Sequence, residues 1–276
     1  MKFSVLMSIY KKENPQYLKE SLESILQQTV LPNEIVIVED GPLTEPLYSV
    51  LNAYAKEYPF IKRVPFKENR GLGLALRDGV LACKNEWIAR MDTDDIAKPN
   101  RFEKQIHFLE LHPDISLLGT GIEEFSEAPD KPDSITILPE TNKEILKFAK
   151  RRNPFRHMTV IFNREAVLRS GNYRHFLWFE DYDLWIRMLS HDYKAANLPE
   201  VLMLVRANKD MFARRGGWKY LKQDVKFQMF LYKIGMIKKR ELFQNTLGRC
   251  IVRILPNKVR VQIYQTFLRE KLRDKA

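Results

Sequence analysis

FSVLMSIYKKENPQYLKESLESILQQTVLPNEIVIV, residues 3–38, predicts a strand, a helix and a second strand. Its two ends, residues 3–9 and 35–38, are short apolar runs of the kind that forms buried strands. Between them Asn14 suits a helix N-cap and Pro15 suits the first helical position, before apolar residues spaced three and four apart. A helix that joins two buried strands favours a parallel pair, so this unit predicts an α/β fold.

The same alternation continues to about residue 110, and helical patterns alone follow residue 216. We therefore predict a mostly parallel, mixed sheet flanked by helices, with a C-terminal helical extension. The further expected strands are 60–66, 87–91, 115–122, 157–162 and 198–205; the expected helices are 47–54, 72–83, 181–189, 217–234, 238–254 and 258–273; the segment 128–139 is expected to be a loop.

Charge is unevenly distributed along the 276 residues. From residue 206 onward there are 19 Lys and Arg against 5 Asp and Glu, whereas the first 205 residues carry 27 against 30. A near-neutral domain is therefore followed by a strongly basic region. The two cysteines, Cys83 and Cys250, support neither a disulfide framework nor a cysteine metal site, and no apolar run reaches transmembrane or signal-peptide length. We expect a cytoplasmic protein.

Polar residues follow three of the predicted strands. The first strand leads to Ser8 and Tyr10, the second to Asp40, and the fourth to Asp92 and the acids after it. Ligands of open α/β sheets bind at the carboxyl ends of strands. Any one of these residues alone would suit an ordinary turn. Together they indicate a ligand site.

WIARMDTDDIAKPNRF, residues 87–102, places Asp92, Asp94 and Asp95 directly after an apolar strand. Neighbouring carboxylates repel one another unless a cation offsets their charge. Mg²⁺ and Mn²⁺ prefer oxygen ligands, and Mg²⁺ often combines one or two carboxylates with substrate phosphates. A solvated turn is the alternative, because a DxD pattern alone is common by chance.

The stretch NRGLGLALRDG, residues 69–79, lacks the spacing of a dinucleotide fingerprint and the lysine of a P-loop. It is either a flexible helix start or a backbone that approaches a ligand closely, with Asn69 and Arg77 as polar contacts. His157 opens a predicted strand, where it would either reach a diphosphate or be a structural histidine.

A second acidic cluster, WFEDYDLWIRM, occupies residues 178–188. Glu180 and Asp181 begin a predicted helix, where acids are commonly stabilised by the helix dipole. The surrounding aromatic residues would also desolvate a carboxylate and raise its pKa toward that of a general base. Trp178 offers a flat surface that suits a sugar ring.

In order along the chain, VLMSIYKKE, IVIVEDG, NRGLGLALRDG, WIARMDTDDIAKPNRF, PFRHMTVIF and FEDYDLWIRM resemble a family 2 glycosyltransferase of the GT-A fold. The likeness is to bacterial enzymes of O-antigen, capsule or exopolysaccharide synthesis and covers about residues 1–206. It implies a catalytic domain over 1–206, with a nucleotide-sugar half at about 1–112 and an acceptor half at about 113–206, before a basic helical region at 207–276.

The resemblance also assigns roles to single positions. Tyr10 and Asp40 match positions that hold the uracil of a UDP-sugar, and Ser8 lines the same pocket. Arg77 stands where many relatives have Asn, preceded by Leu76 instead of Arg, which weakens its expected diphosphate role.

For the metal and the chemistry, the resemblance makes Asp94 the direct ligand of Mn²⁺ or Mg²⁺ and puts Asp92 beside it, near the ribose or sugar hydroxyls. Asp95 is the common third acid of this motif. Asp181 matches the catalytic base, with Glu180 next to it.

The function expected from this likeness is an inverting, metal-dependent hexosyl transfer from a UDP-sugar to a hydroxyl of a glycan carried on a polyprenyl diphosphate. Galactose or glucose is favoured, and an N-acetylhexosamine stays open. The basic C-terminal helices either bind an anionic membrane, on the inner face of the plasma membrane, or pack on the catalytic domain. The alternatives are a DxD-dependent phosphatase or phosphotransferase and a basic nucleic-acid-binding protein.

Overall fold

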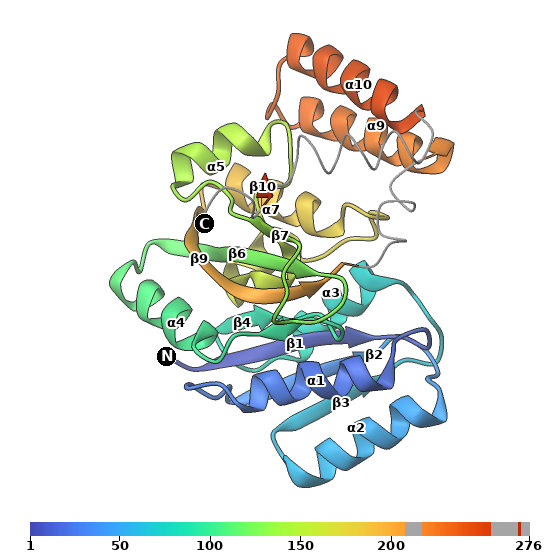
Figure 1. Ribbon diagram of the computed structural model, residues 1–276. Coiled ribbons are helices and arrows are strands. Elements are labelled where there is room, and N and C mark those ends of the chain that lie inside the picture. The colour runs from blue at the N-terminus through green and yellow to red at the C-terminus, as the bar shows by residue number, and fades with distance from the viewer. Residues whose placement is uncertain (208–216, 255–269, 272–276) are drawn as a thin grey trace.

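The computed structural model of the chain describes residues 1–207, 217–254 and 270–271 (Figure 1). Its centre is a mixed sheet in the order β10-β7-β6-β8-β4-β1-β2-β3, with β9 paired to β6 and to β5. The described strands are β1 Phe3–Ile9, β2 Glu34–Glu39, β3 Ile61–Pro65, β4 Trp87–Arg90, β5 Ile96–Ala97, β6 Ile115–Phe125, β7 Ser134–Thr136, β8 Ile161–Asn163, β9 Lys194–Arg206 and β10 Glu270–Lys271.

Strands β3, β2, β1 and β4 run parallel, as the opening strand–helix–strand unit predicts. Beyond β4 the direction changes, because β8 is antiparallel to both β4 and β6. The long strands β6 and β9 are again parallel to each other. The polar loops that follow β1, β2 and β4 therefore emerge at one edge of the parallel half.

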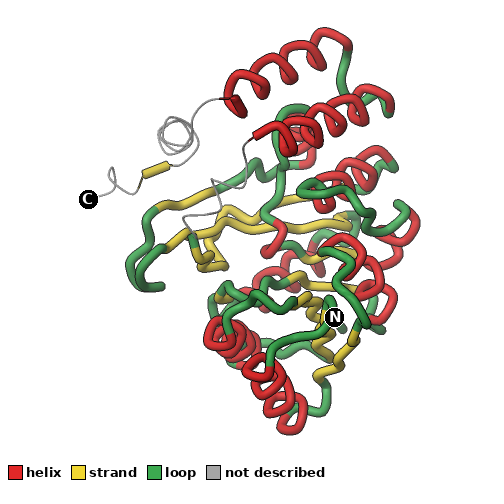
Figure 2. Tube along the Cα trace, turned by 90° about the vertical axis from the view of Figure 1, so that its right-hand side faces the viewer, coloured by secondary structure: helices red, strands yellow, loops and turns green. Residues whose placement is uncertain are grey.

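Helices lie on both sides of the strand layer (Figure 2). Alternation along β1 sends Leu6 to one face, and Val5 and Met7 to the other, so each face has its own hydrophobic core. The described helices are α1 Pro15–Leu26, α2 Glu45–Glu57, α3 Leu72–Ala82, α4 Arg101–Leu111, α5 Asn142–Ala149, the 3-10 helix η1 His157–Thr159, α6 Arg164–Arg169, α7 Glu180–Ser190, α9 Gly217–Lys233 and α10 Lys239–Ile254.

Local signals explain where several helices begin. Asn14 caps α1, since its side chain accepts a hydrogen bond from the backbone of Gln16, and Pro15 is the first helical residue. Thr141 and Glu144 form a reciprocal capping box at the start of α5. These starts are set by residues adjacent in sequence, which is why such boundaries can be predicted.

The helices α9 and α10 form a pair at the upper end of the molecule (Figure 1). Phe227 of α9 is buried against Phe179, which precedes α7, and Tyr182 of α7, with ring centroids 4.9 and 4.5 Å away. The helix pair is thereby joined to the hydrophobic core around α7 by aromatic packing.

Three details of the predicted secondary structure are wrong. Residues 157–159 form the 3-10 helix η1 instead of opening a strand, because β8 begins only at Ile161. The expected loop 128–139 contains β7, which gains its hydrogen bonds from β6 and so could not be found from local sequence. Most of the expected helix 258–273 lies outside the described residues, but residues 270–271 form β10.

Candidate active site

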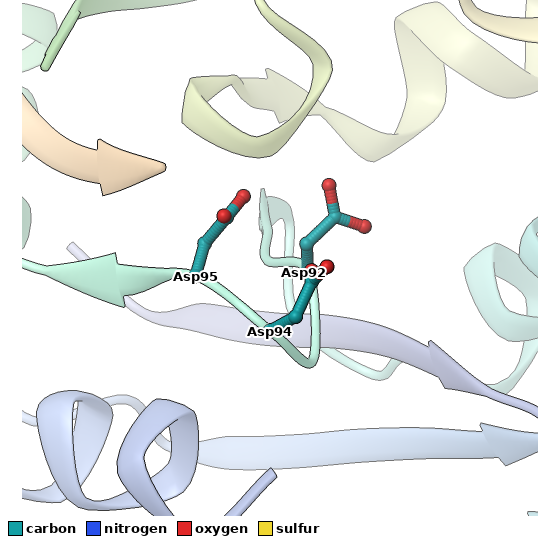
Figure 3. Close-up of side chains that lie close together, drawn as sticks. All are labelled: Asp92, Asp94 and Asp95. Carbon is teal, nitrogen blue, oxygen red and sulfur yellow. The ribbon is translucent and has the colours of Figure 1, made fainter. Parts of the chain in front are cut away.

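Three carboxylates gather in the loop between β4 and β5. Asp92, Asp94 and Asp95 each offer an oxygen, and these three oxygens lie within 4.8 Å of one another. Their carboxyl groups rise from the same side of the loop (Figure 3). This donor set consists only of carboxylate oxygens, which fits a hard divalent cation such as Mg²⁺ or Mn²⁺.

A buried arginine side chain is paired with this cluster. Arg90, the last residue of β4, is 2% exposed and its Nη1 forms an ion pair with Oδ2 of Asp92. A second fully buried arginine, Arg101, donates from Nη2 to the backbone oxygen of Arg90 at 2.8 Å. The protein thus offsets part of the acidic charge with its own guanidinium groups.

The other two acids differ in what surrounds them. Burial, followed by the charge of Asp92, raises the pKa of Asp94 to about 6. Burial, followed by the charges of Asp94 and Asp92, raises the pKa of Asp95 well above its usual range. Asp95 Oδ1 also accepts the backbone N–H of Arg206 at 3.0 Å, so this acid ties the end of β9 to the acidic loop.

The carboxyl ends of β1 and β2 place the expected nucleotide residues at the same edge. Ser8 and Tyr10, at the end of β1, are partly buried. The carboxylate of Asp40 accepts the backbone N–H groups of Arg70 at 2.7 Å and Gly71 at 2.9 Å. Asn69 donates to the backbone oxygen of Asp40 at 3.0 Å. Asp40 therefore fixes the loop that begins α3.

Arg77 is engaged within its own helix. Its Nε donates to Oδ1 of Asp78 at 2.8 Å, while Arg70 donates to the other oxygen of Asp78 at 2.9 Å. These bonds lower the pKa of Asp78 against the opposing effect of burial. The guanidinium of Arg77 is oriented by Asp78, and it is not drawn into the acidic loop.

Asp181 lies in the first turn of α7 and is held by two hydrogen bonds. Oδ2 accepts the side-chain amide of Asn153 at 2.6 Å, and Oδ1 accepts the backbone N–H of Tyr182 at 2.7 Å. Burial raises the pKa of Asp181, although both hydrogen bonds oppose this shift. A carboxylate with a fixed orientation and a raised pKa is suited to accepting a proton.

Glu180 lies beside the first turn of helix α3. A Cβ added to Gly73 would lie 3.2 Å from Cβ of Glu180 and would collide with the backbone oxygen of Arg174. Gly73 thus allows two motifs about a hundred residues apart to touch. Burial, then the charge of Asp181, raises the pKa of Glu180 to about 7, and Asp92 contributes to the same shift. The two acidic motifs are therefore electrostatic neighbours.

The remaining members of the second cluster are structural or peripheral. Asp183 is buried and forms an ion pair with Arg187 at 2.7 Å. Trp178 is 36% exposed, has a left-handed φ of 68° and stacks on Tyr220 at 5.0 Å between ring centroids. A bulky residue in this backbone region is uncommon, so the surrounding packing holds Trp178 in place.

His157 is the first residue of the 3-10 helix η1. Its Nε2 is 2.9 Å from the hydroxyl of Tyr173. Burial and the charge of Arg90 lower the pKa of His157 well below its usual value, which favours a neutral ring. The contact with Tyr173 and the burial of the ring favour a structural role for His157.

Two residues of this arrangement, Arg90 and Asn153, were missed by the sequence analysis. An arginine that ends an otherwise apolar buried strand is a visible signal for Arg90, since an isolated buried charge is costly. Asn153 precedes a proline and gives only a turn signal, because its contact with Asp181 spans 28 residues.

Comparison with known protein families identifies the family of this chain. The family model described as "Glycosyl transferase family 2" matches residues 4–176. The chain belongs to glycosyltransferase family 2. The predicted family is confirmed, and the protein is a glycosyltransferase. This assignment replaces the two alternative interpretations, a phosphatase and a nucleic-acid-binding protein.

Relatives of this glycosyltransferase are similar over nearly their full length. One is the amylovoran biosynthesis glycosyltransferase AmsE of Erwinia amylovora, 43% identical over 95% of this chain and 98% of the relative. Another is the UDP-Gal:alpha-D-GlcNAc-diphosphoundecaprenol beta-1,3-galactosyltransferase of Escherichia coli, 37% identical over 98% of both chains. A third is the O-antigen biosynthesis glycosyltransferase WbnJ of Escherichia coli, 32% identical over 74% of this chain and 78% of the relative.

Solved structures confirm the GT-A fold. S. aureus TarS 1–349 in complex with UDP-GlcNAc matches 90% of this glycosyltransferase and 72% of that chain, with a TM-score of 0.68 at 15% identity. The mannosyltransferase PcManGT of Pyrobaculum calidifontis, in complex with GDP-Man and Mn²⁺, matches 95% and 72% with a TM-score of 0.63 at 17% identity.

None of the helices that the structure describes combines the length and apolar character needed to span a bilayer.

Proposed function

We propose that this glycosyltransferase moves a hexose, galactose or glucose, from a UDP-sugar to a hydroxyl of a glycan carried on a polyprenyl diphosphate, with inversion. The observation that carries this proposal is the arrangement of two acidic motifs, one after β4 and one at the start of α7, which lie close enough for the charge of Asp92 to contribute to the raised pKa of Glu180. The Escherichia coli relative supports the choice of donor and acceptor by its name, and an N-acetylhexosamine remains the alternative sugar.

The nucleotide is bound at the ends of β1 and β2. Tyr10 stacks on the uracil, Ser8 lines its pocket, and Asp40 accepts a hydrogen bond from the base. Each carboxylate oxygen of Asp40 accepts one backbone N–H and has a further lone pair for this bond. Asn69 and Arg77 lie on the neighbouring loop and helix as diphosphate contacts, Arg77 the weaker of the two because Asp78 orients it.

Asp94 and Asp92 hold Mn²⁺ or Mg²⁺ in the proposed active enzyme. The raised pKa of Asp94, to about 6, supports this assignment because a cation relieves the crowding of negative charge. When bound, such a cation supplies positive charge that stabilises the departing diphosphate. Asp92, paired with Arg90, is also directed to the ribose or sugar hydroxyls, and Asp95 supports the loop through Arg206.

Asp181 is the general base. It accepts the proton of the acceptor hydroxyl, whose oxygen then attacks the anomeric carbon from the side opposite to the UDP leaving group. Asn153 and the Tyr182 backbone hold the carboxylate in place for this transfer. One displacement converts an α-linked donor into a β-glycoside. Glu180 adjusts the charge beside the base, and Trp178 borders the acceptor side.

The chain is divided, in this proposal, into a catalytic domain over 1–206 and a basic helical region over 207–276. Nucleotide-sugar binding falls in 1–112 and acceptor binding in 113–206. A lipid-linked acceptor places the enzyme at the inner face of the bacterial plasma membrane as a peripheral protein.

A panel of UDP-sugars tests the proposal directly. Purified enzyme is incubated with each donor, Mn²⁺ and a synthetic lipid-diphosphate N-acetylglucosamine acceptor, and the product linkage is read by NMR. We expect a β-linked hexose from UDP-galactose or UDP-glucose. A retained α-configuration, or transfer from no UDP-sugar in the panel, would refute the proposal.

A further inference from the structure

The outward face of α9 combines cations with exposed apolar groups. Successive helical residues turn by about 100°, which puts Trp218, Lys222, Lys226, Met229 and Lys233 on one side of the helix. All five are exposed. The opposite side carries the residues that are buried against the rest of the molecule, including Phe227 and Leu231.

This face is positively charged without an acidic counterpart in the same helix. Besides the three lysines already named, Lys219 is exposed, whereas the single acid of α9, Asp224, is fully buried. Asp224 accepts a hydrogen bond from Arg249 of α10 at 2.6 Å, on the inner side of the helix pair. The surface that α9 presents is therefore cationic along its whole length.

Large apolar side chains stand among these lysines. Trp218 is 73% exposed, and Met229 and Tyr232 are each 41% exposed. Helices that lie in a membrane interface combine lysines with Trp and other apolar residues in this way. Indole and phenol rings are favoured at the headgroup level of a bilayer.

The same face continues into the segment before the proposed base. Lys219 lies over the ring of Trp178, with Nζ 5.9 Å from its centroid, and Lys226 lies 5.4 Å from the centroid of Phe176. Trp178 precedes Asp181 by three residues. A surface bound to α9 is therefore close to the point where an acceptor hydroxyl must arrive.

We propose that the outward face of α9 docks this enzyme on an anionic membrane surface, with the four lysines facing lipid headgroups and Trp218 inserted at the interface. The proposal rests on the proposed function to the extent that a lipid-linked acceptor is what the enzyme meets there. A second copy of the chain fits this face less well, because its lysines would face the same lysines. A nucleic acid would pair with the lysines but would leave the apolar side chains of Trp218 and Met229 exposed to solvent.

Flotation with vesicles tests the docking. Full-length protein is mixed with vesicles of phosphatidylcholine alone or with a third of phosphatidylglycerol, and the partition constant is measured at two salt concentrations. We expect binding only to the anionic vesicles, weakened by salt. Each basic residue near such a surface contributes about 1 kcal/mol, so a Lys222→Ala, Lys226→Ala, Lys233→Ala variant should bind roughly 100-fold more weakly.

Exposed aromatic residues on the two C-terminal helices give a matched pair of variants. Trp218→Ser should bind anionic vesicles about tenfold more weakly than the wild type. Phe243→Ser, on α10, should bind like the wild type, although Phe243 is 68% exposed. Its helix meets α9 where Asn245 donates a hydrogen bond to Gln228 at 3.1 Å, and Gln228 is buried whereas Trp218 is exposed.

Several outcomes would overturn the docking proposal. They are equal binding to neutral and anionic vesicles, unchanged binding of the α9 variants, or equal losses in Trp218→Ser and Phe243→Ser. A wild-type dimer that Trp218→Ser converts to a monomer would assign the face to contact between copies instead. Tight binding to an oligonucleotide that abolishes flotation and does not depend on Trp218 would likewise contradict it.

The transfer reaction separates this proposal from the proposed function. With a short-chain, water-soluble diphosphate acceptor, the α9 variants should keep wild-type rates, and with the same acceptor headgroup in anionic vesicles they should lose activity in parallel with binding. Vesicle binding without any hexosyl transfer would refute the proposed function alone. A transfer rate in vesicles that is the same for the wild type and the α9 variants would refute the docking proposal alone.

Discussion

The side-chain amide of Asn153 donates a 2.6 Å hydrogen bond to Oδ2 of Asp181, joining the turn before η1 to the first turn of α7. The bond favours the ionised carboxylate and so lowers the pKa of Asp181, against the rise that burial causes. Loss of the amide should therefore raise this pKa and let the carboxylate rotate.

For Asn153→Ala we expect kcat to fall about tenfold to a hundredfold, since hydrogen bonds to charged groups contribute roughly 1.5–3 kcal/mol. The acidic limb of the pH–rate profile should move to higher pH, because a base with a raised pKa is ionised only there. KM for the UDP-sugar should change little. Asn52→Ala, an exposed asparagine on α2, is the control, and an unshifted pH profile would contradict the positioning role.

Replacing the proposed base should separate catalysis from binding. Asp181→Asn keeps the size of the side chain and removes its ability to accept a proton, so turnover should fall by about 10²–10⁴-fold. UDP affinity, measured by calorimetry, should stay nearly unchanged because the proposed nucleotide site lies at the ends of β1 and β2, away from Asp181. Full activity in Asp181→Asn would remove this residue from the mechanism.

Removal of divalent cations should abolish transfer. EDTA treatment should stop activity, and Mn²⁺ or Mg²⁺ should restore it. Asp94→Asn should weaken the Mn²⁺ dependence of UDP binding, since a neutral amide loses the charge that attracts the cation. Asp130→Asn, at an exposed position, should behave as the wild type. Activity that survives EDTA would exclude the metal-dependent mechanism.

The ion pair of buried Arg90 and partly exposed Asp92 should be coupled in stability. Arg90→Met leaves the Asp92 charge without its partner, and a loss of about 2–3 kcal/mol in the free energy of unfolding is expected. Asp92→Asn on that background should cost little more, which a double-mutant cycle of urea denaturation would detect. Strictly additive losses would mean that the two groups do not interact.

Glu180 should make stability depend on pH. Its pKa in the folded protein is raised from 4.5 to about 7, so between these values the folded state keeps a proton that the unfolded state has released. Its contribution to the free energy of unfolding is therefore full below pH 4.5 and declines as pH rises through 7. Glu180→Gln should flatten this decline in urea denaturation at pH 5 and pH 8; an unchanged slope would disprove it.

Much of the fold of the N-terminal half could be predicted from local sequence. The buried strand patterns at 3–9 and 35–38 and the Asn14–Pro15 helix start each depend on neighbouring residues, and the structure has them as predicted. The strand β7 could not be found in this way, because its short segment owes its extended form to hydrogen bonds with β6. The 3-10 helix η1 was also missed, because its three residues begin an apolar run that resembles a strand.

The sequence by itself determined the family, the α/β alternation and the presence of two acidic motifs, one after a predicted strand and one at the start of a predicted helix, because each is encoded in adjacent residues. Only the tertiary structure decided that Gly73 meets Glu180, that Arg90 lies beneath Asp92, and that Asn153 holds Asp181. Burial, and charges that are distant in sequence, shift a pKa only when folding brings the groups within a few ångströms, and packing of the sheet and helices sets those distances.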